Sequence, residues 1–256
     1  MTRWDPSLYL QHAGDRGRPF VELLARVPAT APARVLDLGC GAGNLSSVIR
    51  DRWPGADVLG VGASEEMIAH AREVDPDGRY EVADVNALTP DGPYDVIVSN
   101  AMFQWLPDAF AVITRLLDAV QDGGAFAVQV PDNQDAPSHR LMREVAARPA
   151  FADHTQGVRE FSATDAPAYL ELFAGLGWTA DVWTTEYLHV LEGDDAVWGW
   201  VSGTGARPYV QALPDGLREQ FVAEYQAELR AAYPQRDWGT VFPFARTFAV
   251  ATRPDR

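Results

Sequence analysis

Between Ala33 and Pro131, short apolar runs alternate with longer amphipathic stretches, and no other feature of the chain restricts its fold as strongly. Parallel strands need a crossover connection, which is usually a helix, so this alternation predicts βαβ units in a parallel sheet. Continuous runs of Val, Leu and Ile suit strands that are covered on both faces. Crossover helices are predicted between strands that we expect at residues 34–38, 57–61, 79–83, 94–100 and 124–130.

The pattern changes after Pro131. The segments that follow predict a helix-prone region, a helix, a strand, a helical region and a closing strand, at residues 133–160, 165–176, 178–191, 194–233 and 244–253. We expect the two late strands to join the sheet as an antiparallel pair. The helices between them would then lie over the strand ends as a lid.

Composition excludes several functions. The 36 acidic and 21 basic residues give a formal net charge of −15, which repels a polyphosphate backbone, so nucleic acid is not an expected partner. All basic residues are Arg, which excludes a Schiff-base or phosphate-loop lysine. Cys40 is the only cysteine, which excludes an internal disulfide and a multi-Cys metal site, and the five histidines lack metal spacing, so we expect no metal. No apolar run reaches the roughly 18 residues of a membrane span, so we predict a cytoplasmic protein without a membrane partner.

Three glycines follow the first predicted strand at alternate positions, in the segment VLDLGCGAGN (35–44). Ligands of open parallel sheets bind beyond the carboxyl ends of the strands, and glycine lets the backbone approach an adenosine-type cofactor closely. The GxGxG spacing differs from the GxGxxG of dinucleotide sites, which argues against a nicotinamide-dependent dehydrogenase. Asp37 would place a carboxylate near a cationic or amine-bearing ligand. A tight turn without a ligand is the alternative interpretation.

VLDLGCGAGN resembles the first motif of the class I S-adenosylmethionine-dependent methyltransferases. The segments WDPSLYL (4–10), FQWLPD (103–108), WVSGTGARPY (200–209) and FPFARTFAVATR (242–253) also resemble the trans-aconitate 2-methyltransferase family. The resemblance covers nearly the whole chain. It implies S-adenosylmethionine as cofactor, S-adenosylhomocysteine as product, and a methyl ester formed on a carboxylate of a small polycarboxylic acid such as trans-aconitate.

The resemblance also implies the fold. We expect a Rossmann-like α/β fold, with a mostly parallel seven-stranded sheet, an antiparallel C-terminal strand and a helical lid. A single methyltransferase domain would span residues 1–256, with an N-terminal helical cover (1–32), a cofactor-binding core (33–132) and lid insertions at 133–165 and 192–243. A monomer or weak homodimer is expected.

The residues that would hold the cofactor follow from the same resemblance. Its methionine end would be lined by Asp37, Gly39, Cys40, Gly41 and Gly43. Asp84 would accept a hydrogen bond from the adenine amino group, with Val85 beside the ring. Asn100 and Ala101 would lie under the sulfonium and face the acceptor. The turn after the second strand would add Gly62, Ala63, Ser64 and Met67.

Gly62 departs from the family, which has an acidic residue there that accepts both ribose hydroxyls. Two charge-assisted hydrogen bonds, each worth about 1.5–3 kcal/mol, are thereby lost unless Ser64, Glu65 or an ordered water takes that place. Cofactor binding would then be weakened, altered or vestigial. The alternatives to a methyltransferase are accordingly a non-methylating enzyme that acts on a small acid, or a binding protein that kept the fold.

A carboxylate acceptor is already ionised at neutral pH, so methylating it needs no general base. We therefore predict no catalytic residue in the narrow sense, with proximity and water exclusion supplying the rate. A polyanionic acceptor does need local arginines in so acidic a protein. The predicted acceptor-binding residues are Arg207 foremost, then Arg16 and Arg246, with Tyr9, Gln104, Trp105 and Tyr209 as pocket walls.

Overall fold

The computed structural model describes residues 13–159 and 165–255, with side chains from Gly17 on. These residues form two compact units, which are described separately. The α/β unit holds residues 13–131, 165–185 and 246–255, and the helical unit holds residues 132–159 and 186–245. Two strands, β6 (Thr179–Leu191) and β7 (Thr240–Thr252), pass from one unit into the other.

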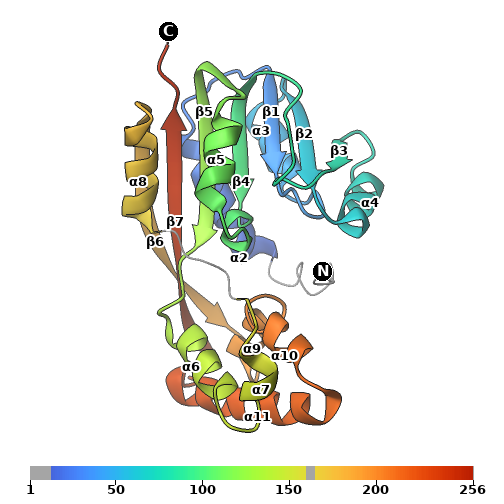
Figure 1. Ribbon diagram of the computed structural model, residues 1–256, viewed down its shortest axis with the longest axis vertical. Helices are drawn as coiled ribbons and strands as arrows, with labels where there is room; N and C mark the ends of the chain where they lie inside the picture. Colours follow the sequence, from blue (N-terminus) through green and yellow to red (C-terminus); the bar gives the residue numbers. More distant parts are fainter. Residues whose placement is uncertain (1–12, 160–164, 256) are drawn as a thin grey trace. The chain divides into compact units, whose positions relative to one another are not determined.

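A seven-stranded sheet has the order β3-β2-β1-β4-β5-β7-β6 (Figure 1). The pairs β3–β2, β2–β1, β1–β4 and β4–β5 are parallel, whereas β7 is antiparallel to β5. This confirms the predicted mostly parallel sheet with an antiparallel C-terminal strand. The remaining strands are β1 (Arg34–Leu38), β2 (Asp57–Gly62), β3 (Arg79–Val82), β4 (Tyr94–Asn100) and β5 (Val120–Pro131).

Strand β5 begins at Val120, four residues before the predicted start, which was therefore wrong. Its pairing with β4 shifts register between Tyr94 and Val96, as in a β-bulge, and Gly123 has φ +72°. Glycine tolerates this left-handed conformation, so the chain bends there and continues to pair. A Gly-Gly pair that suggests a turn in the sequence is thus part of a strand. Strand β7 also starts earlier than predicted, at Thr240.

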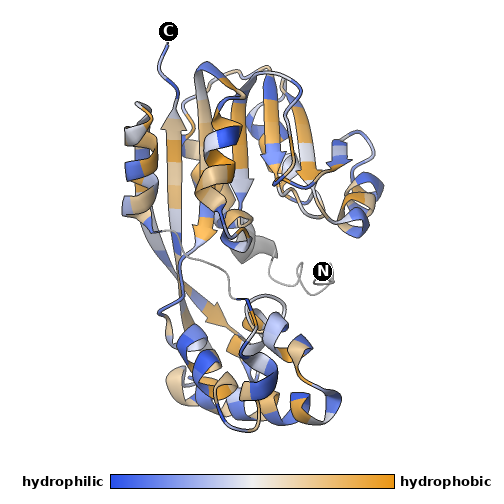
Figure 2. Ribbon diagram, in the orientation of Figure 1, coloured by the Kyte–Doolittle hydropathy of each residue, from blue (hydrophilic) through white to orange (hydrophobic). Residues whose placement is uncertain are grey.

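The helices of the α/β unit are α2 (Ala13–Arg26), α3 (Ser46–Arg52), α4 (Glu65–Val74), the short 3-10 helix η1 (Phe103–Trp105), α5 (Ala109–Leu117) and α8 (Ala166–Gly175). Helices α5 and α8 pack on one face of the sheet, where Ile113 and Phe173 join Leu36, Ile97 and Phe126 in the main apolar core. Figure 2 shows hydrophobic residues along β1 and β2, as expected for strands covered on both faces.

Helices α2 and α3 pack on the opposite face, which we call the α2–α3 face. Ser46 of α3 donates a hydrogen bond to Asp37 of β1, and the guanidinium of Arg26 in α2 lies 4.0 Å from the ring centre of Trp183. Trp183 in turn stacks on Phe248 of β7, with ring centres 4.8 Å apart. Because side chains alternate along a strand, the register places Asp37, Phe248 and the side chains in line with them on this one face.

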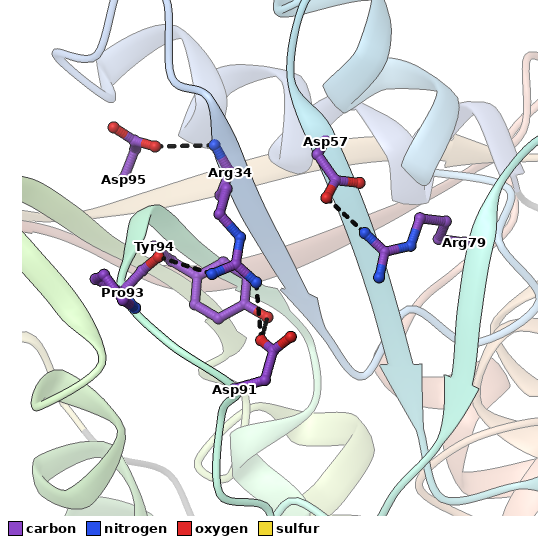
Figure 3. A network of polar contacts seen from close by, with 7 residues as sticks. All are labelled: Arg34, Asp57, Arg79, Asp91, Pro93, Tyr94 and Asp95. Atoms are coloured by element: carbon purple, nitrogen blue, oxygen red, sulfur yellow. Dashed lines mark hydrogen bonds and ion pairs between the residues drawn. The ribbon is translucent and has the colours of Figure 1, made fainter.

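A polar network connects the amino ends of the parallel strands (Figure 3). Arg34 at the start of β1 donates to Asp91, which also accepts from the Tyr94 hydroxyl at the start of β4. Asp57 and Arg79 pair in the same way between β2 and β3. The hydrogen bond from Tyr94, and then that from Arg34, lowers the pKa of Asp91. The network therefore braces the end of the sheet from which the strands start.

The helical unit contains α6 (Pro137–Ala146), α7 (Ala152–Thr155), α9 (Ala196–Ser202), α10 (Arg207–Ala212) and α11 (Asp215–Ala232). Its core is rich in aromatic side chains, among them Phe151, Trp200, Phe221, Tyr225 and Phe242. This confirms the predicted helices between residues 194 and 233. The role of residues 133–165 and 192–243 as a lid stays a prediction. Within the described part of the chain, every helix is too short or too polar to cross a membrane.

Candidate active site

The strand order itself indicates where a ligand would bind. From β1 the chain moves to β2 and β3 on one side, whereas β4 and β5 lie on the other side of β1. Ligands of open α/β sheets bind outside the carboxyl ends of the strands at such a switch point. The candidate site therefore lies where β1 ends at Leu38 and β4 ends at Asn100.

The turn after β1 is built on three glycines. Gly39, Gly41 and Gly43 all have left-handed φ angles, of +75°, +59° and +78°. The amides of Gly39 and Cys40 both donate to the carbonyl oxygen of Val61, at 2.8 and 3.1 Å, which fastens the turn to β2. A Cβ added to Gly39 would lie 2.5 Å from Cγ of Met102. Conformation and space therefore both require glycine at position 39.

Asp37 is a buried carboxylate beside this turn, with 3% of its surface exposed. The Ser46 hydroxyl donates to its Oδ2 at 3.0 Å. Burial raises the pKa of Asp37 to about 7, although the Ser46 hydrogen bond opposes part of the shift. A carboxylate in such surroundings is stabilised by a cation, so this position suits the ammonium group of a ligand.

Cys40 is a packed, unreactive thiol. It is buried against Ile68, Ala71 and Tyr80. Burial, and then the nearby charge of Asp37, raises the pKa of the Cys40 thiol. The contribution of Cys40 to the site is therefore its shape and its backbone.

Gly62 ends β2 with room for a side chain. A Cβ built there would meet Cδ1 of Ile68 at 3.4 Å and Sγ of Cys40 at 3.9 Å, which are ordinary contacts. The next residue, Ala63, is exposed, and Ser64 accepts a hydrogen bond from the amide of Met67 as the N-cap of α4. The hydroxyl of Ser64 is thus already engaged, and nothing in the backbone demands glycine at position 62.

Asp84 and Val85 follow β3. Asp84 is exposed, and its Oδ1 accepts from both the amide and the side-chain nitrogen of Asn86, at 2.9 and 2.8 Å. Val85 is partly buried against the main core. These contacts hold the Asp84 carboxylate in one orientation at the surface, where a ligand could reach its second oxygen.

The end of β4 stores backbone strain. Ala101 has φ +54°, a left-handed conformation that is uncommon for a residue with a Cβ. It is held there by its amide, which donates to the Gln129 carbonyl at 2.8 Å, and by its carbonyl, which accepts from the Gln104 side chain at 2.8 Å. Strain of this kind persists where the surroundings fix it, often at functional sites.

Several polar atoms near Ala101 are buried without a hydrogen-bond partner in the described part of the chain. They include Oδ1 of Asn100 and Oε1 of Gln104, a residue that is 5% exposed. Trp105, the last residue of η1, follows Gln104 in the sequence and is partly buried. A buried polar group without a hydrogen bond destabilises the folded state, so this end of β4 is suited to a polar ligand that would supply the missing hydrogen bonds.

Arg246 of β7 lies at the same end of the sheet. It is 4% exposed, and its Nη1 donates to Oε1 of Gln129 at 3.1 Å. Gln129 itself was not predicted as a site residue. The sequence feature that could have identified Gln129 is its position as a polar residue within the apolar run AFAVQV, a pattern that indicates a buried polar group with a function.

Two of the other predicted acceptor residues, Arg207 and Tyr209, belong to the helical unit. Arg207 is partly buried in the first turn of α10 in the helical unit. Tyr209 is 5% exposed and stacks on Phe221 with ring planes 8° apart, so its ring packs in the core of that unit, and its role as a pocket wall stays a prediction. Tyr9 and the side chain of Arg16 fall outside the described residues.

Comparison with known proteins adds the family. The profile described as a methyltransferase domain matches residues 11–180. A protein of Streptomyces avermitilis named trans-aconitate 2-methyltransferase is 49% identical over 97% of this chain and 96% of its own length. A protein of the same name from Methylobacterium nodulans is 44% identical over 99% of both chains.

Solved structures with low sequence identity share the fold. The plantazolicin methyltransferase BpumL, in complex with a pentazolic desmethylPZN analogue and SAH, matches with a TM-score of 0.56 and 15% identity over 97% of this chain and 89% of its own. The [4+2]-cyclase SpnF matches with a TM-score of 0.56 and 15% identity over 93% of this chain and 81% of its own. A methyltransferase and a cyclase thus share this fold, so the fold alone does not determine the reaction.

Proposed function

The chain belongs to the trans-aconitate 2-methyltransferase family of S-adenosylmethionine-dependent methyltransferases, and from this premise we propose that it forms a methyl ester on a carboxylate of a small polycarboxylic acid such as trans-aconitate. The observation that carries the proposal is identity of 49% over 97% of the chain, which includes both units. The acceptor would be a small anionic molecule.

The residues after β1 fit the methionine end of S-adenosylmethionine. The glycine turn offers backbone without side chains, and a second backbone or ligand can approach it closely. Asp37 offers a buried carboxylate to the ammonium group of the cofactor. Asp84 and Val85 would hold the adenine, and Asn100 and Ala101 would border the methyl group.

The ribose end fits less well. Gly62, Ala63 and Ser64 supply no carboxylate, and the Ser64 hydroxyl caps α4. Glu65 in the first turn of α4 is the next acidic side chain along the chain. We therefore propose that the cofactor is held mainly by its methionine and adenine ends, with a weaker ribose contact than an acid at position 62 would make.

S-adenosylmethionine, when bound, supplies an electrophilic methyl group, and its transfer to a carboxylate oxygen breaks a carbon–sulfur bond and forms a carbon–oxygen bond without releasing a proton. No side chain of the protein therefore has to remove a proton. The protein's task is to align the acceptor and exclude water. Arg246 of the α/β unit would attract the acid into a chain whose net charge of −15 otherwise repels it, and Arg207 stays a predicted acceptor residue of the helical unit.

Gly62 also supports a second candidate function. A methyltransferase fold that binds its cofactor weakly could serve a non-methylating reaction of a small acid, or binding alone. The test is calorimetry with S-adenosylhomocysteine, followed by mass spectrometry of di- and tricarboxylic acids incubated with S-adenosylmethionine. A gain of one methyl group supports the proposed function. Cofactor binding without methylation of any acid supports the second candidate, and no cofactor binding at millimolar concentration refutes the proposed methyl transfer.

A further inference from the structure

Three side chains form a continuous polar row on the α2–α3 face, at the carboxyl ends of β4 and β5. Asn100 of β4 pairs in register with Gln129 of β5, so their side chains lie next to each other. Gln129 pairs in turn with Phe248 of β7, and Arg246 lies two residues before Phe248, on the same face. The hydrogen bond from Arg246 to Gln129 completes the row.

The two amide side chains of this row, Asn100 and Gln129, have unused hydrogen-bonding capacity. Gln129 is 0% exposed, and its Oε1 accepts from Arg246 while its Nε2 has no partner among the described residues. Oδ1 of Asn100 is in the same condition. An amide nitrogen buried without an acceptor is rare in folded proteins, because it has lost its water and gained nothing in return. Such a donor indicates a ligand that brings an acceptor.

The surroundings make this donor suitable for an anion. The guanidinium of Arg246 stays charged at any physiological pH and presents several N–H donors in a plane. Phe248 and the stacked Trp183 lie on the same face and keep the local dielectric low. A carboxylate at this place would accept from Nε2 of Gln129 with one oxygen and from Arg246 with the other.

We propose that Gln129 and Arg246 form a clamp for a carboxylate of the acceptor that is not itself methylated. The inference rests on the proposed function and names a specificity residue for it. Hydrogen bonds and a cation held against a carboxylate lower the nucleophilicity of its oxygens, so a clamped carboxylate is a poor methyl acceptor. The reacting carboxylate must therefore be a second one, and the minimal acceptor is a dicarboxylate.

The test uses two substitutions of Gln129 and one control. Gln129→Met keeps the length of the side chain and removes the donor. Gln129→Glu places a carboxylate beside Arg246, and this carboxylate competes with that of the acceptor for the guanidinium. The matched control is Gln121→Met, on the same strand but at its amino end, where Gln121 is exposed and donates to Asp95.

Calorimetry measures S-adenosylhomocysteine binding alone, and then trans-aconitate binding to that complex. Both Gln129 variants are expected to weaken trans-aconitate binding roughly 10- to 100-fold, as expected for a lost hydrogen bond to a charged group. Their affinity for S-adenosylhomocysteine should stay within about twofold of the wild type. In turnover assays the KM for trans-aconitate should rise by a similar factor, with a much smaller change in kcat. The control should match the wild type in every measurement.

A merely structural role would give a different pattern. Loss of packing at position 129 would lower kcat and cofactor affinity together with acid affinity, and that result would overturn the clamp. Unchanged trans-aconitate binding in Gln129→Met would overturn it too. If Gln129→Met does not fold, Gln129→Glu gives the same decision, because it retains a polar side chain bonded to Arg246. Failure of the proposed function is distinct: the wild type itself would then methylate no acid.

Discussion

Replacing Asp37 by Asn should stabilise the protein and weaken cofactor binding at the same time. Burial raises the pKa of Asp37 from 3.8 to about 7, which corresponds to about 4 kcal/mol. The folded state thus holds a proton that the unfolded state has released. Below about pH 4 the carboxyl is protonated in both states and does not lower the free energy of unfolding. Between about pH 4 and 7 the free energy of unfolding falls as the pH rises, because only the unfolded state releases the proton readily.

An asparagine has no such proton to lose and still accepts from Ser46. The free energy of unfolding of the variant should therefore exceed that of the wild type by an amount that grows from near zero at about pH 4 to about 4 kcal/mol at pH 8. The melting temperature at pH 8 should rise by about 10 °C. Affinity for S-adenosylhomocysteine should fall at least tenfold, because the ligand ammonium loses its counter-charge.

Urea unfolding and thermal melts at one-unit steps from pH 5 to 8 measure the difference, with calorimetry for the ligand. Asp57→Asn is the matched control, since Asp57 is an exposed carboxylate paired with Arg79 at the other end of the sheet. It should change stability by at most about 1 kcal/mol and keep the pH slope of the wild type. Parallel pH profiles of Asp37→Asn and the wild type would refute the argument from burial.

Three further predictions concern the same site. Gly62→Asp should tighten S-adenosylhomocysteine binding at least tenfold by calorimetry, since its Cβ has ordinary room and its carboxylate can accept two ribose hydroxyls; an unchanged Kd would show that the ribose is already held by another group. Gly39→Ala should lower stability by about 2–4 kcal/mol in urea unfolding, because its Cβ would lie 2.5 Å from Met102 in a left-handed backbone. Gly41→Ala, with 3.9 Å to its nearest neighbour, should cost clearly less, and equal costs would contradict the steric argument. Cys40 should resist iodoacetamide at pH 8 in the native protein but react in urea, because burial raises its thiol pKa, and rapid alkylation of the native protein would contradict this.

The parallel core and the glycine turn could be predicted because both rest on local sequence. Apolar runs indicate the strands, and three glycines after the first strand indicate a turn in which a Cβ is not tolerated. Gly62 was noticeable only against the family pattern, and the structure adds that the position has room for a side chain.

Other features depend on contacts that no local pattern contains. Gln129 meets Arg246 across 117 positions of sequence, so its partner could not be deduced from the run AFAVQV. Tyr209 follows a Gly-rich turn in the sequence, but its ring stacks on Phe221 of another helix. The bulge at Gly123 lengthened β5 beyond its apolar run, because backbone pairing with β4 continued where hydrophobicity did not.

The network of Arg34, Asp57, Arg79, Asp91 and Tyr94 lies at the end of the sheet where the strands begin (Figure 3). The candidate active site lies at the opposite end of the strands. An effort to make this enzyme more heat-resistant can therefore vary the exposed ion pairs Arg34–Asp91 and Asp57–Arg79 in small steps, since each is worth at most about 1 kcal/mol, while the buried Tyr94 is kept. The turnover number should not change with those substitutions, so stabilising mutations can be introduced at that end of the sheet first.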